Sequence, residues 1–335
     1  MAGGRTLRQL IKAGAAGSTE DFRRAAEKVI EEERQKKHHL LATDLERILY
    51  GQARSGSRGD VVASLPPVPS DRERKLPLLE VREPVRSLED LVVADGVRHV
   101  LEEVLLEQGR RDILTSWGLR PIGRLLFVGP PGCGKTLASE VLATELGLPL
   151  VVIRFDAVVS SFLGETAANL RLVFDYLAVG RYLALFDEFD AIAKEREDET
   201  EHGELRRVVS ALLQMMDSYR GESLLVAASN HEGMLDRALW RRFDEVVKFD
   251  RPSQAEVVRL LQAKLRGVRR DFELESDDVS QAFLGFSHAD IERVVIRSVK
   301  SMVLGGREFL SKATLLKALE REVERRAVSA AESSR

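Results

Sequence analysis

Three glycines, a lysine and a threonine stand together in the segment Gly129-Pro130-Pro131-Gly132-Cys133-Gly134-Lys135-Thr136, with a spacing that suits phosphate binding. An apolar run precedes this segment and a helical pattern follows it. Glycines let the backbone curl so that its N–H groups face phosphate oxygens, and the helix adds its positive N-terminal end. We expect Lys135 to reach the β- and γ-phosphates of ATP and Thr136 to bind Mg²⁺. The predicted phosphate-binding residues are Pro131, Gly132, Cys133, Gly134, Lys135, Thr136 and Leu137.

The single cysteine of the chain, Cys133, lies inside this segment. Its simplest role is that of a small residue that contributes its backbone amide. A lowered thiol pKa beside a helix N-terminus is the alternative. One cysteine excludes an intrachain disulfide and a four-cysteine zinc site, and it favours a reducing, cytoplasmic setting.

Two adjacent carboxylates, Asp187 and Glu188, end a second apolar run about 50 residues further on. A carboxylate at a strand tip can organise Mg²⁺, directly or through water, and its neighbour can polarise the attacking water as a general base. We therefore assign Asp187 with Thr136 to the metal and Glu188 to catalysis. The alternative is an acidic pair that caps the next helix.

Two further polar groups complete the candidate chemistry. Asn230 follows the apolar run 225–229, where it can hydrogen-bond the water or the γ-phosphate, although asparagine is also a common turn residue. Arg241 and Arg242 follow a helical segment, and arginine forks suit the charge of a transferring phosphoryl group. A salt-bridged surface pair is the alternative for the arginines.

The elements that must position these groups alternate along the middle of the chain. Short apolar runs recur at 125–128, 150–153, 182–186, 224–227 and 246–249, and helical patterns such as 95–109 separate them. This alternation predicts a parallel sheet covered by helices on both faces. After Pro252 the runs stop, and helical patterns at 253–266, 275–284, 288–304 and 311–327 predict a small helical region.

The segments outside this core differ in character. Residues 1–51 show helical spacing with a capping box at Ser18 and a second start at Thr43, which predicts a small helical region. Residues 52–88 are rich in proline and mixed charge, which predicts an extended linker or a loop packed on the next domain. We thus expect domains at 1–51, 52–88, 89–250 and 251–328, with a frayed tail at 329–335.

Composition limits the possible partners. The chain has 335 residues, with 51 Lys+Arg against 54 Asp+Glu and a formal net charge of −3. This balance disfavours nucleic acid as a partner, despite a basic cluster formed by Lys264, Arg266, Arg269 and Arg270. No run reaches the roughly 20 apolar residues of a membrane span, so we expect no membrane partner.

Together these motifs resemble the AAA family of ATPases across about residues 88–327. The resemblance is carried by the phosphate-binding segment, Asp-Glu-Phe-Asp-Ala-Ile-Ala at 187–193, Leu-Asp-x-Ala-Leu at 235–239 and Gly-Phe-Ser-His-Ala-Asp-Ile at 285–291. It implies an α/β fold of the P-loop NTPase type: an αβα parallel five-stranded sheet with a C-terminal helical lid subdomain, here preceded by a small all-α N-terminal region. It also implies ATP and Mg²⁺ as cofactors and a homo-oligomeric ring, usually a hexamer.

The resemblance also implies roles for single residues. Asn230 would be the first sensor of the γ-phosphate, and Arg241 and Arg242 would complete the neighbouring subunit's site as arginine fingers. The adenine contacts would be Val92 and Val93 within residues 90–93, and the lid would contribute His288 and Ala289. Phe162 and Leu163 would grip a polypeptide in the central pore, and residues 195–204 fit a second pore loop or a solvated charged loop.

Several residues depart from the family pattern. Cys133 stands where threonine is usual, Ser161 where lysine is frequent, and His288 where glycine is common. The arginine-finger segment, which ends in Arg241-Arg242, resembles that of katanin and spastin. The sequence thus predicts an ATP-hydrolysing ring that remodels, unfolds or threads a protein partner. One alternative is a nucleotide-gated scaffold for an effector such as a protease or nuclease, for example in a bacterial stress or defence system. The other is a nucleic-acid-dependent ATPase.

Overall fold

The chain divides into two units, Met1–Pro67 and Val68–Arg335, which are described separately. The structure is a computed structural model that describes residues 22, 24–29, 65–71, 73–158, 163–189, 202–230 and 240–332. In the first unit residues 24–29 are helical and Ala25 is buried. The predicted helix starts at Ser18 and Thr43 lie outside the described residues.

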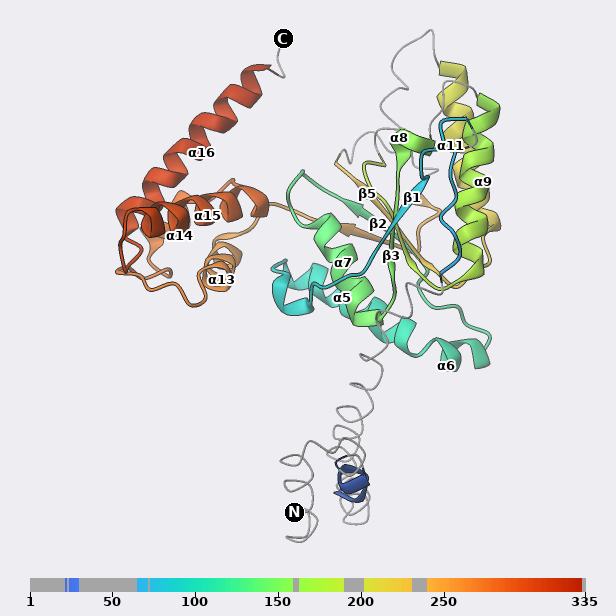
Figure 1. The fold of residues 1–335 in the computed structure, drawn as a ribbon, viewed down its shortest axis with the longest axis horizontal. Coiled ribbons are helices and arrows are strands. Elements are labelled where there is room, and N and C mark those ends of the chain that lie inside the picture. Colours follow the sequence, from blue (N-terminus) through green and yellow to red (C-terminus); the bar gives the residue numbers. More distant parts are fainter. Residues whose placement is uncertain are drawn as a thin grey trace. The chain divides into compact units, whose positions relative to one another are not determined.

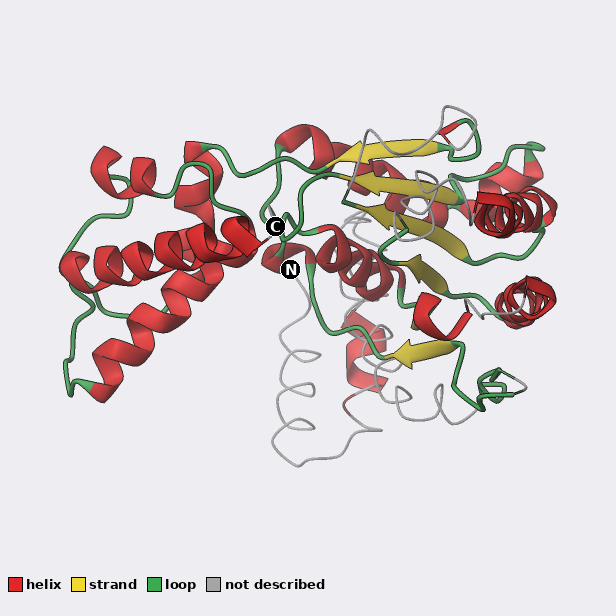
Figure 2. Cartoon of the chain, turned by 90° about the horizontal axis from the view of Figure 1, so that it is seen from above, coloured by secondary structure: helices red, strands yellow, loops and turns green. Residues whose placement is uncertain are grey.

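One six-stranded sheet organises the second unit, in the order β1-β3-β4-β5-β2-β6. Figure 2 shows its strands in yellow beside the helices. Strands β2, β3, β4, β5 and β6 run parallel and β1 pairs antiparallel with β3. The five predicted parallel strands are therefore present. The strands are β1 Leu79–Arg82, β2 Arg124–Val128, β3 Leu150–Ile153, β4 Leu183–Phe186, β5 Leu224–Ser229 and β6 Glu245–Lys248.

Helices cover both faces of this sheet, with α5 and α7 on one face and α9 and α11 on the other (Figure 1). Side chains such as Leu101 of α5 and Val141 of α7 are fully buried against Phe127 of β2. Strands β4 and β5 are buried at every residue, as expected for parallel strands between two helical layers. The bounds are η1 Leu88–Asp90, α5 Asp95–Gly109, α6 Arg111–Ser116, α7 Lys135–Leu146, α8 Phe155–Val158, α9 Leu163–Val179 and α11 His202–Ser218.

Strand β1 comes from the proline-rich segment 52–88, for which no strand was predicted. Before it, the buried Asp71 accepts a hydrogen bond from the side-chain amide of Asn169 on α9 at 2.7 Å. The backbone N–H of Arg74 donates to the same carboxylate at 2.6 Å. Proline excludes helix but tolerates turns and edge strands, so this stretch packs on the domain as a turn and an edge strand.

A helical lid follows the last strand, with α13 Gln254–Lys264, α14 Asp277–Ala282, α15 His288–Leu304 and α16 Lys312–Glu332. Its own core includes Leu261, Phe283, Ile291 and Leu315. The four helices match the four predicted ones. Helix α16 reaches Glu332 and so includes four residues of the predicted tail 329–335, where two alanines favour helix. Among the helices of the described residues, none has the length and apolar character to cross a bilayer.

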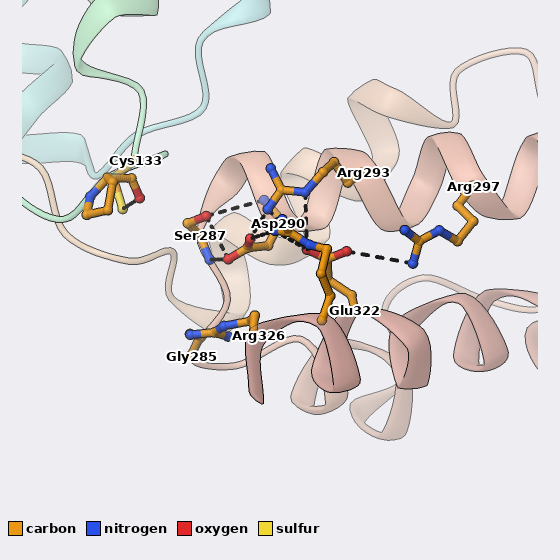
Figure 3. A network of polar contacts seen from close by, with 10 residues as sticks. Cys133, Gly285, Ser287, Asp290, Arg293, Arg297, Glu322 and Arg326 are labelled. Atoms are coloured by element: carbon orange, nitrogen blue, oxygen red, sulfur yellow. Dashed lines mark hydrogen bonds and ion pairs between the residues drawn. The ribbon is translucent and has the colours of Figure 1, made fainter. Parts of the chain in front are cut away.

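A buried carboxylate, Glu322, ties α16 to α15 (Figure 3). It accepts a hydrogen bond from Arg293 at 3.1 Å and lies 3.7 Å from Arg297. Arg325 of its own helix lies at 2.7 Å, and Arg293 also contacts Asp290. A buried charge needs such partners to offset its lost hydration. The network therefore fixes the first turns of α15, which carry residues of the site described next.

Candidate nucleotide-binding site

A hollow of about 370 Å³ opens where β2, β4 and β5 end. Ligands of open parallel α/β sheets bind at this edge, because loops from several strands meet there. The hollow has one wall from the sheet domain and one from the lid. It is lined by Asp90, Leu91, Val92, Pro131, Gly132, Gly134, Lys135, Thr136, Leu137, Asp187, Glu188, Asn230, Leu260, Lys264, His288, Ala289 and Glu292.

The phosphate loop needs glycine for two physical reasons. Gly129, Gly132 and Gly134 have φ values of +143°, +74° and +98°, a region that disfavours residues with a Cβ atom. A Cβ atom at Gly129 would also lie 1.9 Å from the carbonyl oxygen of Phe249. The loop therefore curls tightly from β2 into α7, as the spacing predicted.

Lys135 is the buried cation of this loop, with only 6% of its surface exposed. Its Nζ donates to the carbonyl oxygens of Gly129 at 2.6 Å and Pro130 at 2.9 Å. These contacts hold the ammonium group at the start of α7, beside the hollow. The loop thus combines a fixed positive charge with a helix N-terminus, which is an arrangement that attracts phosphate.

Thr136 and Asp187 bring oxygen atoms from two elements together. The Thr136 hydroxyl donates to the Asp187 carboxylate at 2.9 Å, and that carboxylate also accepts from the Glu188 N–H at 2.9 Å. Hydroxyl and carboxylate oxygens are ligands that Mg²⁺ accepts. The two residues predicted for the metal therefore fit it in chemical type and in position.

Glu188 has a strained backbone, with φ of 53° in the left-handed region. Such a conformation costs of order 1–3 kcal/mol in a residue other than glycine and persists only where the surroundings enforce it. The enforcing group is Phe189, which is buried and donates its N–H to the Ala228 carbonyl of β5 at 2.9 Å. This anchor leaves the Glu188 side chain exposed and lining the hollow, with Asn230 at the end of β5 in the same wall.

Residues 90–92 and the lid also line the hollow. Val92 lines it, whereas Val93 is 4% exposed and belongs to the core of the sheet domain. Adjacent side chains of an extended segment point to opposite sides, so both valines cannot face one ligand. Of the two predicted adenine contacts, the structure therefore brings only Val92 to the hollow.

The lid contacts the phosphate loop directly. The Ala289 N–H donates to the Gly132 carbonyl at 3.0 Å. Arg259 of α13 also donates to the Val93 carbonyl at 3.4 Å. Ser287 caps α15, accepting from the Asp290 N–H, and so fixes His288 and Ala289 at the start of that helix. The predicted lid residues thus lie in the wall of the hollow.

Two titratable groups of the site are shifted by burial. Burial lowers the pKa of His288, against the opposing effects of the Glu256 carboxylate and the Val92 backbone, and both ring nitrogens are buried. Burial raises the pKa of the Cys133 thiol, and the nearby Lys135 only partly offsets this. The raised pKa favours the protonated thiol of Cys133, so the alternative of a lowered thiol pKa is wrong. Its side chain is 1% exposed, so it contributes to the loop through its backbone.

The two predicted arginines lie apart from the hollow. Arg241 and Arg242 precede β6 and do not line it; Arg242 is paired with Asp217 of α11 at 2.9 Å. Leu163 begins α9, and Phe162 lies outside the described residues. Leu91 lies within the predicted segment 90–93, although it was not singled out as a contact. Sequence reasoning missed Leu260 and Glu292, and it placed Lys264 in a basic cluster. Lys264 and Leu260 lie on one lid helix and Glu292 on another. Their positions in the sequence do not show that they line one site, because this depends on how the two helices pack together.

The fold and this edge of the sheet define a P-loop nucleoside triphosphatase. A family model, the ATPase family associated with various cellular activities (AAA), matches residues 125–251. An uncharacterized AAA family ATPase of Sinorhizobium fredii, y4kL, is 40% identical over 98% of this chain and 97% of its own length. The chain belongs to the AAA family of ATPases, and it is an ATP hydrolase.

ATP-dependent zinc metalloproteases are also similar to this chain. The chloroplastic ATP-dependent zinc metalloprotease FTSH 1 of Arabidopsis thaliana is 31% identical over 82% of this chain. The ATP-dependent zinc metalloprotease FtsH 1 of Thermomicrobium roseum is 29% identical over 72% of it. The chain spans only 39% and 38% of the lengths of these two relatives.

Proposed function

We propose that this ATPase forms a ring, a hexamer by resemblance, and uses ATP turnover to remodel, unfold or thread a protein partner. One observation carries the proposal: among the described residues that line the hollow there is no arginine. The charge of a transferring γ-phosphoryl group is stabilised by cations, and arginine is the common one. Arg241 and Arg242 lie outside their own hollow, which supports their action on the site of a second copy.

Within one site we assign each residue a role. Lys135 and the loop amides bind the β- and γ-phosphates, and Thr136 and Asp187 hold Mg²⁺, which when bound neutralises phosphate charge. Glu188 polarises the attacking water, and Asn230 orients that water or the γ-phosphate. Val92, His288 and Ala289 contact the nucleoside. The strained backbone of Glu188 supports its role, because strain of this kind concentrates at functional positions.

A protein partner is supported by the similarity to ATP-dependent proteases. We assign the grip on this partner to Phe162 and Leu163, which immediately precede and begin α9. The near-neutral charge of −3 disfavours nucleic acid. We place the ring in the cytoplasm, where the single cysteine stays reduced.

A second candidate is a nucleotide-gated scaffold that regulates a separate effector such as a protease. The similarity to ATP-dependent zinc metalloproteases supports a protease as the effector class. In this case the partner is not translocated, and ATP turnover acts as a timer. The two candidates differ in whether Phe162 is needed to hold the protein partner.

Glu188→Gln tests the proposal, because it removes the general base and leaves the phosphate contacts intact. We expect the variant to bind ATP, to lose hydrolysis by at least about 100-fold, and to retain a polypeptide partner in pull-downs with ATP. Adding Phe162→Ala should release that partner while nucleotide binding persists. Undiminished hydrolysis in Glu188→Gln would contradict the assigned base. Partner retention without Phe162 would favour the scaffold.

A further inference from the structure

A charged pair lines the hollow on its lid side. Lys264 near the end of α13 lies 2.6 Å from the Glu292 carboxylate on α15, and both residues line the hollow. Their side chains are 27% and 42% exposed, so each remains accessible beside the other. Glu292 follows His288 by four residues, which places both on one face of α15.

We assign this pair to the nucleoside rather than to the phosphates. Lys135, Thr136 and Asp187 mark the phosphate and metal end, whereas Glu292 lies in the lid wall with Leu260. A carboxylate facing a triphosphate would repel it, and a carboxylate balanced by Lys264 leaves the lid wall close to neutral. A neutral but polar wall suits the uncharged part of a nucleotide.

Of the two parts of a nucleoside, the ribose is the better hydrogen-bonding partner for Glu292. The base is flat and fits the apolar side chains of Val92 and Leu260 in the same hollow. The ribose offers two neighbouring hydroxyl donors, and a carboxylate is the acceptor that receives two such donors at once. One Glu292 oxygen accepts from Lys264, which orients the carboxylate and leaves acceptor capacity for the sugar.

We propose that Glu292, oriented by Lys264, recognises the ribose hydroxyls of the bound nucleotide. The inference rests on the proposed function of the hollow as the ATP site and adds the part of the ligand that the lid recognises. The competing explanation is a surface ion pair that only links α13 to α15. Such a pair would contribute little and would not distinguish sugars.

The test compares ATP with 2′-deoxy-ATP and 3′-deoxy-ATP in displacement of a fluorescent ATP analogue from the full chain. A hydrogen bond to a charged acceptor corresponds to about a tenfold change in affinity, so the wild type should bind each deoxynucleotide about tenfold more weakly. Glu292→Ala should bind all three alike, and Glu292→Gln should keep only part of the preference. The matched control is Glu308→Gln, which disrupts the lid pair of Glu308 with Arg269 away from the hollow.

The outcomes separate this inference from the proposed function. Failure of the wild type to bind ATP at all would remove both. Binding and hydrolysis of ATP without preference for the ribonucleotide would overturn only the role of Glu292, and so would a preference that survives Glu292→Ala. If that variant fails to fold, the wild-type series and Glu292→Gln still decide the question.

Discussion

Burial changes the properties that single residues of the site would have in water. Lys135 is buried and donates to two backbone carbonyls, and Cys133 is a buried thiol with a raised pKa. His288 carries two buried ring nitrogens. Each state follows from burial, which the sequence pattern alone does not reveal.

The buried imidazole of His288 should make the stability of the protein depend on pH. The pKa of His288 is lowered from 6.5, so folding favours its neutral form; the stabilisation is present above pH 6.5 and is lost as pH falls through the folded pKa. Glu256 faces the ring from α13 and limits the shift, and the Lys264–Glu292 pair lines the same hollow. The melting temperature of the wild type should fall between pH 6.5 and 5, and His288→Gln should show a shallower fall.

His99→Gln is the control for this experiment, since His99 is an exposed histidine of α5. It should keep the wild-type pH dependence. Parallel melting curves for wild type and His288→Gln over this pH range would contradict a buried neutral imidazole.

At the scale of elements, the lid and the phosphate loop meet through backbone atoms. The N-terminus of α15 is fixed by the Ser287–Asp290 capping box, and Ala289 bonds to Gly132. Sequence reasoning predicted the five parallel strands and the four lid helices, because each is a local hydrophobic or capping pattern. It did not predict β1, because an edge strand depends on a partner strand far along the chain.

Gly132 should control how closely the lid sits on the loop. A Cβ atom there would lie 2.8 Å from the Ser287 hydroxyl oxygen and 3.0 Å from the Ala289 Cβ atom, so Gly132→Ala must displace α15. We expect ATP affinity to fall about tenfold or more, measured by fluorescent nucleotide titration.

Gly118→Ala separates displacement of the lid from backbone strain. Gly118 has a similar φ of +73°, but a Cβ atom there would meet nothing within 4 Å. Through backbone strain, Gly118→Ala should lose about as much folding stability as Gly132→Ala does, of order 1 kcal/mol. It should still bind ATP normally. Equal ATP affinity in the two variants would show that the lid contact is unimportant for binding.

At the scale of the whole molecule, the arginines and the phosphate loop lie at opposite ends of parallel strands. Arg241 and Arg242 come before β6, whereas the phosphate loop follows its parallel neighbour β2. A strand of four residues spans about 13 Å, so the arginines are far from their own phosphate end. Arg242 is paired with Asp217, and Arg241 is exposed, which makes Arg241 the stronger candidate for the neighbouring site.

Two inactive variants should therefore rescue each other. Arg241→Ala keeps its own phosphate loop but cannot complete a neighbour, and Lys135→Ala has the reverse defect. Co-expressed in equal amounts, they should form wild-type interfaces at about a quarter of positions and recover about that share of ATP hydrolysis. Activity no higher than that of either variant alone would refute catalysis between copies. Arg242→Ala, tested in the same way, would assign the role between the two arginines.

The sequence by itself determined the phosphate loop, the Asp187–Glu188 pair and the order of elements, because glycine conformation, charge and hydrophobic period are properties of short segments. Only the tertiary structure decided that Val92 rather than Val93 lines the hollow, that Lys264 pairs with Glu292, and that the arginines lie away from their own site. These facts depend on which helix packs beside which strand. Packing joins residues far apart in the chain through burial and close contact, and no local pattern encodes it.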